Sequence, residues 1–118
     1  MKKELPKENW VQLLSDFAIY NEGSLVSLYT KSKEGERQIG ENNLIAFEGD
    51  CDGEIVNGVK IVIGGEGESP KELVHYVKSP VSISYEENEE KGTVDKLTLI
   101  SQDEIKTILE SIGEDLVL

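Results

Sequence analysis

Three carboxylates alternate in a short glycine-bearing segment near the middle of the chain: Asp50, Asp52 and Glu54, around Gly53. Carboxylate oxygens are the ligands that hard cations such as calcium prefer. The segment lacks the ligand spacing and the terminal bidentate glutamate of the helical calcium-binding loop. It therefore predicts at most a weak metal site, and an acidic surface turn is the alternative interpretation.

The chain contains a single histidine, His75, and a single cysteine, Cys51. On an alternating strand His75 shares a face with Leu73 and Val77, where a histidine is usually a hydrogen-bonded residue at the edge of the core. A histidine beside a thiol would form a base and nucleophile pair, but no motif brings Cys51 to His75. His75 is therefore a weak candidate for a functional role, and we predict no catalytic residue and no cofactor.

Other motifs that carry chemistry are missing from the sequence. The glycine-rich run at residues 64–67 has no lysine, serine or threonine where a phosphate-binding loop needs one, and its glutamate would repel phosphate. The sequence contains no dinucleotide fingerprint, no zinc-ligand spacing and no Ser/His/Asp order. An enzyme is therefore the minority interpretation.

The net charge of the chain indicates which classes of partner it would attract and which it would repel. Its 24 acidic residues outnumber 12 basic ones, which gives a net charge of -12. Such a surface repels nucleic-acid phosphates and anionic lipids, so we expect neither nucleic acid nor a membrane as a partner, whereas a basic protein would be attracted. An acidic mimic of nucleic acid acting on a DNA-binding protein is an alternative. That mimic needs an acidic ridge, for which the candidates are Glu66, Glu68 and the acids of residues 86–90.

One amphipathic helix near the N-terminus organises the predicted fold. Apolar residues recur there at helical spacing: Trp10, Leu13, Leu14, Phe17 and Ala18. Pro6 suits the first turn of a helix, because its missing N–H costs nothing there. We predict a helix over residues 7–20 that ends with a left-handed cap at Asn21 or Gly23.

Alternating, β-rich runs predict the strands. They cover residues 25–30, 44–47, 59–63, 73–78, 81–85 and 96–100. Residues 101–112 fit a capped helix as well as a returning strand. The pattern predicts one α+β domain over residues 1–118, with the N-terminal helix packed on an antiparallel sheet of about six or seven strands, which a partly open small barrel would also satisfy.

Two strands, at residues 59–63 and 96–100, carry apolar residues on both faces. A helix of about 14 residues spans about 21 Å, so it covers only part of such a sheet. We expect the remainder to be buried in a closed monomeric barrel or in a homodimer. A dimer would be tighter at high ionic strength, because two copies of a -12 chain repel each other. No apolar run is long enough for a signal sequence or a membrane span, so we expect a cytoplasmic protein.

Several segments carry a likeness to a known family. They are residues 3–10 (KELPKENW), Asp16-Phe17, Glu22-Gly23, residues 73–80 and residues 97–103. Together they resemble a bacterial family catalogued as domain of unknown function 5335, DUF 5335. The resemblance spans nearly the whole chain, and it departs at Ser24, where an aromatic is usual, and at Glu104, where a glycine is usual. It implies that the segment after Asp103 is a returning strand, and it implies no activity.

The composition, the motifs and the resemblance favour a small acidic, non-enzymatic interaction or binding module. The acidic nucleic-acid mimic is the first alternative. A small enzyme or weak metal-binding protein, using His75 or the turn with Asp50, Asp52 and Glu54, is the second.

Overall fold

The structure, a computed structural model, describes residues 2–64 and 72–118. The expected acidic positions Glu66 and Glu68, and the glycine-rich run after Gly64, lie outside the described residues. The described part of the chain forms a 3₁₀ turn (Lys7–Asn9), one helix and eight strands: α1 (Trp10–Asn21), β1 (Lys2–Glu4), β2 (Leu25–Ser32), β3 (Gly35–Asp52), β4 (Ile55–Gly64), β5 (Glu72–Lys78), β6 (Pro80–Asn88), β7 (Thr93–Ser101) and β8 (Lys106–Ser111).

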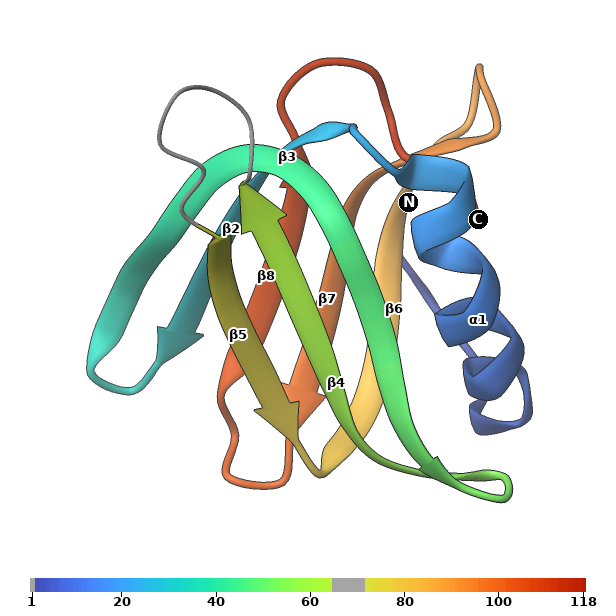
Figure 1. The fold of residues 1–118 in the computed structure, drawn as a ribbon, viewed down its shortest axis with the longest axis vertical. Helices are drawn as coiled ribbons and strands as arrows, with labels where there is room; N and C mark the ends of the chain where they lie inside the picture. The colour runs from blue at the N-terminus through green and yellow to red at the C-terminus, as the bar shows by residue number, and fades with distance from the viewer. Residues whose placement is uncertain (1, 65–71) are drawn as a thin grey trace.

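The eight strands form one antiparallel sheet in the order β1-β6-β7-β8-β2-β3-β4-β5. Strand β3 is 18 residues long; its first half pairs with β2 and its second half pairs with β4. It arches over the top of the molecule, so that β3, β4 and β5 lie in front of the remaining strands (Figure 1). Strands β1 and β5 are the two ends of the sheet, so the sheet is curled but open.

The predicted α+β class is confirmed, but the predicted count of six or seven strands is too low. The additional strand is β1, which pairs with β6 from Lys2↔Glu86 to Glu4↔Ser84. All three residues of β1 are exposed, so no apolar alternation marks this strand in the sequence. It is held by backbone pairing at the sheet edge and by an ion pair from Lys3 to Glu87.

Helix α1 buries the stripe that the spacing predicts. Trp10, Leu13, Leu14 and Phe17 are all buried, and the rings of Phe17 and Phe47 lie 4.7 Å apart between centroids. A Cβ added to Gly49 of β3 would lie 2.6 Å from Leu14 Cδ1, so the helix packs directly on the β3 backbone there. The predicted helix began three residues earlier, because the first residues form a 3₁₀ turn instead.

Curling of the sheet buries the apolar strands within a single chain. Val59, Ile61, Leu97 and Leu99 are fully inaccessible to solvent. The Leu73 side chain of β5 packs on the backbone of Gly40 in β3, since a Cβ added to Gly40 would lie 2.5 Å from Leu73 Cδ1. The strands at residues 59–63 and 96–100 therefore bury their inward side chains without a partner chain.

The structure decides between strand and helix after Ser101, and between strand and turn around Asp52. Residues 106–111 form strand β8, which pairs with both β7 and β2, as the family resemblance implies. The turn before it has Glu104 at a φ of +67°, a left-handed conformation that favours the glycine usual in the resembled family. The acidic surface turn expected at Asp50, Asp52 and Glu54 is wrong over most of its length, because β3 continues to Asp52 and only Gly53 and Glu54 form the turn.

Candidate functional site

Edge strand β5 exposes an unusual run of apolar side chains. Leu73, Val74 and Tyr76 have 40%, 59% and 47% of their surface accessible. Among the described residues, β5 pairs with β4 alone, so its other edge has no strand beside it. Exposed apolar edge strands are places where another chain can add a strand.

The hydrogen bonds at the end of β5 show which backbone groups are free to pair. Ser79 N–H donates to Asn57 O at 2.9 Å, next to the Gly58↔Lys78 pair. Inward and outward groups alternate along a strand, so Leu73, His75 and Val77 direct their N–H and C=O groups to β4. Glu72, Val74, Tyr76 and Lys78 direct theirs away from the sheet.

Tyr76 lies flat across the outer face of the sheet. A Cβ on Gly58 would overlap its phenol ring, so glycine is needed at that position for the ring to pack there. The Tyr76 hydroxyl donates to Asp50 Oδ2 at 3.3 Å. Desolvation against the sheet, and then the charge of Asp50, raise the pKa of Tyr76. Asp50 thus positions a side chain of the edge strand.

His75 lies on the inner face of β5 and is half-buried. Its Nε2 is 3.2 Å from Oγ1 of Thr107, a buried residue of β8, so this contact ties the sheet edge to the opposite layer. Burial lowers the pKa of His75. Cys51 is exposed at the far end of β3, and no contact joins it to His75 in the described structure.

The lowered pKa of His75 has a consequence for stability. The unfolded chain binds the histidine proton more tightly than the folded chain does, so the folded state loses stability as pH falls below the ordinary histidine pKa of about 6.5. Between pH 7.5 and about pH 5.5, the melting temperature of the wild-type protein should therefore fall further than that of a His75→Gln variant. Thermal denaturation at several pH values in this range measures the difference. Parallel curves of melting temperature against pH for the two proteins would contradict the prediction.

The three carboxylates of the suspected metal site do not converge. Asp50 contacts Tyr76, whereas Glu54 borders a surface depression beside Lys7 and Glu8, before the first turn of α1. Within residues 2–64 and 72–118, no group of three or more His, Cys, Asp or Glu side chains is placed to hold a metal ion.

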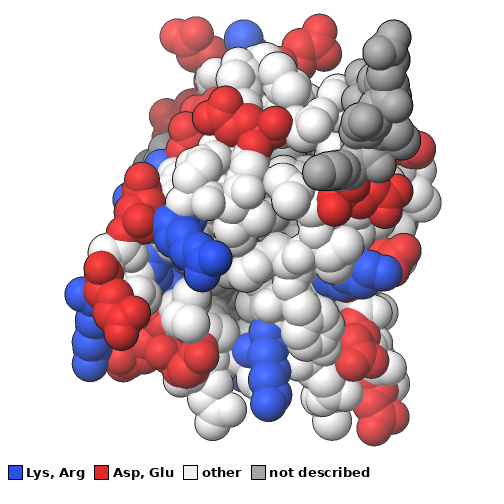
Figure 2. Space-filling view, turned by 60° about the vertical axis from the view of Figure 1, so that its left-hand side comes forward, with Lys and Arg blue, Asp and Glu red and all other residues white. Residues whose placement is uncertain are grey.

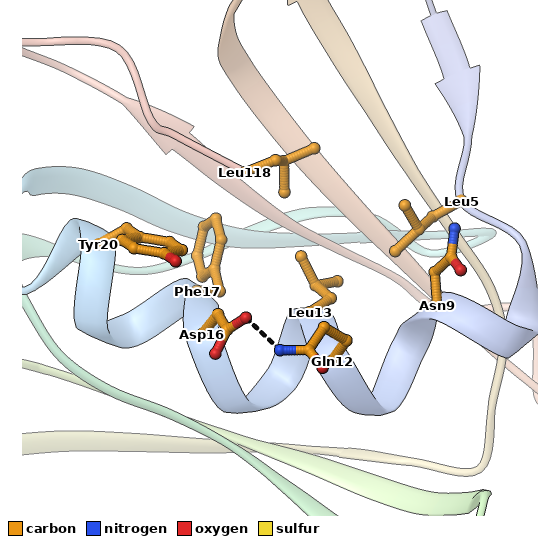
Figure 3. A pocket seen from close by; sticks show the side chains of 8 residues that line it. All are labelled: Leu5, Asn9, Gln12, Leu13, Asp16, Phe17, Tyr20 and Leu118. Atoms are coloured by element: carbon orange, nitrogen blue, oxygen red, sulfur yellow. Dashed lines mark hydrogen bonds between the residues drawn. The ribbon is translucent and has the colours of Figure 1, made fainter.

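A pocket of about 340 Å³ lies between α1 and the two ends of the described chain (Figure 3). Leu5, Leu13, Phe17 and Leu118 form its apolar lining. Its rim carries Asn9, Gln12, Asp16 and Tyr20, and Gln12 donates a hydrogen bond to Asp16. The lining residues contain no histidine or cysteine, and the apolar side chains at its centre can receive an apolar group.

Asp95 and Asp115 form a pair of neighbouring carboxyl groups that the sequence does not predict. Asp115 accepts hydrogen bonds from Thr93 Oγ1 at 2.8 Å and from Asn88 Nδ2 at 3.3 Å, and these, with the neighbouring Asp95, lower the pKa of Asp115. A hydrogen bond to Asp115 raises the pKa of Asp95. The isolated bridge Val94↔Leu116 brings the two together, and no local pattern signals it.

On the face that Figure 2 shows, uncharged side chains occupy the centre and acidic ones lie mainly around the edges. This face is the left-hand side of Figure 1, where β5 and the β2–β3 hairpin lie. An uncharged centre inside a charged rim is the anatomy of protein interfaces.

Comparisons with models of known protein families, with curated proteins and with solved structures found no match. Membership of the resembled family therefore stays a prediction. No helix in the described part of the chain is long and apolar enough to cross a membrane.

Proposed function

We propose that the protein is a non-enzymatic interaction module that binds another protein chain along the free edge of β5. The observation that carries the proposal is the exposure of Leu73, Val74 and Tyr76 on a strand with one unpaired edge in the described structure. Strand addition supplies affinity through main-chain hydrogen bonds, and alternate side chains supply specificity.

The charge of the chain narrows the kind of partner. At -12 the surface disfavours nucleic acid and anionic lipid and favours a basic protein. Strand β5 itself is balanced, because it carries Glu72 at one end and Lys78 at the other, with His75 between them. A partner can therefore pair with this strand without being strongly basic itself.

Val74→Lys tests the proposal, because it places a charge on the outer face of the edge strand where a paired chain would cover it. Ile19→Lys is a matched control, since Ile19 is an exposed apolar residue on α1, at 71%. In quantitative affinity capture from cell extract, we expect a set of bound proteins that Ile19→Lys retains and Val74→Lys loses. The same set bound by all three proteins would contradict the proposal.

A further inference from the structure

Strand β5 is complementary to itself when reversed. Its sequence, ELVHYVK, reads outward from His75 as Val74 against Tyr76, then Leu73 against Val77, and finally Glu72 against Lys78. The outermost pair has opposite charges, and the two inner pairs are apolar. Reversal of the strand therefore sets each of these six residues opposite one that suits it, and His75 opposite itself.

We propose that the β5 edges of two copies of this chain pair antiparallel about a twofold axis at His75, which joins their sheets. This proposal rests on the proposed function of the β5 edge and names its partner as a second copy. Twofold pairing is isologous, so each contact occurs twice. Glu72 then lies opposite Lys78 of the partner subunit, and Val74 lies opposite Tyr76 of the partner subunit.

The direction of the backbone N–H and C=O groups along β5 allows hydrogen bonds in this register. The outward-directed groups belong to Glu72, Val74, Tyr76 and Lys78, given the bond from Ser79 to Asn57. In the proposed register these residues face one another, so each outward N–H meets an outward C=O. A valine opposite a tyrosine is a favourable cross-strand pair of a β-branched and an aromatic side chain. Both stand on the outer face, away from the interior contact of Leu73 with Gly40.

Local charge at the strand counteracts the repulsion between two acidic chains. The two Glu72–Lys78 pairs attract, while the net charge of -12 on each copy repels and is screened by salt. These two effects predict different responses to single substitutions. Glu72→Lys makes the chain less negative, so net charge alone would tighten association, whereas the paired register sets Lys opposite Lys78 and weakens it.

Sedimentation equilibrium at high micromolar protein tests the register with Glu72→Lys, Lys78→Glu, the double variant and an equimolar mixture of the two single variants. Both residues are exposed, so the fold is preserved. We expect each single variant to associate about tenfold more weakly than wild type, because two attractive pairs become repulsive. The double variant and the mixture should restore association, since both recreate opposite charges across the axis.

Several results would overturn the proposal. A wild-type monomer at high micromolar protein, or tighter association of Glu72→Lys than of wild type, excludes this dimer. If Val74→Lys still abolishes binding of another protein in that case, the β5 edge remains a binding surface and only the identity of the partner is wrong. A wild-type dimer that Val74→Lys and both charge reversals leave unchanged contradicts this dimer and its use of the β5 edge.

Discussion

Replacing Trp10 by alanine will lower the free energy of unfolding by about 3–5 kcal/mol, the range for a large core aromatic. Trp10 is 5% exposed and is the first residue of α1, where the helix meets the core. Its Nε1–H donates to Leu5 O at 3.0 Å, so the side chain also holds the segment that links β1 to the helix. The substitution therefore removes both apolar packing and a hydrogen bond.

Urea denaturation followed by circular dichroism measures this effect without relying on tryptophan fluorescence. Val11→Ala is the matched control, because Val11 is the next helical residue but is 36% exposed, and it should change stability by less than about 1 kcal/mol. Native wild-type fluorescence should differ from that of the unfolded chain. A Trp10→Ala variant as stable as Val11→Ala would contradict the packing described for α1.

Asn21→Asp will cost about 2–4 kcal/mol, because a buried amide becomes a buried carboxylate that cannot donate. Asn21 is 2% exposed, and its Nδ2 donates to Phe17 O and to Val117 O, each at 2.7 Å. Its Oδ1 accepts from Val117 N–H, also at 2.7 Å. The aspartate would face two carbonyl oxygens, so of the two hydrogen bonds between residue 21 and Val117 only the one that Val117 N–H donates would remain.

Asn43→Asp provides the control for this amide. Asn43 Nδ2 also donates to a backbone carbonyl, that of Gly23 at 2.6 Å, but its hydrogen bond is exposed to water. Solvent can replace the lost donor there, so we expect a change below about 1 kcal/mol. Equal losses in the two variants, measured by chemical denaturation at pH 7, would show that the contact between Asn21 and Val117 contributes nothing specific.

The features that the sequence predicts well are those set by local periodicity. The apolar stripe from Trp10 to Phe17 identifies α1, and the alternation around His75 identifies β5 to within one residue. Strand β1 has no such pattern, since its three exposed residues are held by pairing with a strand some eighty positions away along the chain. The length of β3 was missed because its first nine residues are mostly polar and none of them is buried, and because bulges interrupt its alternation after Leu44 and Asp50.

The candidate site depends on order in the sheet, which local patterns do not contain. Nothing in the residues of β5 says that it pairs with β4 and ends the sheet, yet that position makes Val74 and Tyr76 accessible to another chain. The residues suspected from chemistry have structural partners instead. His75 contacts Thr107, and Asp50 holds the Tyr76 hydroxyl.

Amide hydrogen exchange across β5 tests the central claim most directly, because adjacent residues on this strand should behave differently. In dilute protein, the N–H groups of His75 and Val77 should be protected by β4, while those of Val74 and Tyr76 should exchange rapidly. At a concentration that saturates binding, Val74 and Tyr76 should become protected, and the amides of His75 and Val77 should change little. Uniform protection along β5 that does not depend on concentration or on an added partner would contradict the claim that this edge binds another chain.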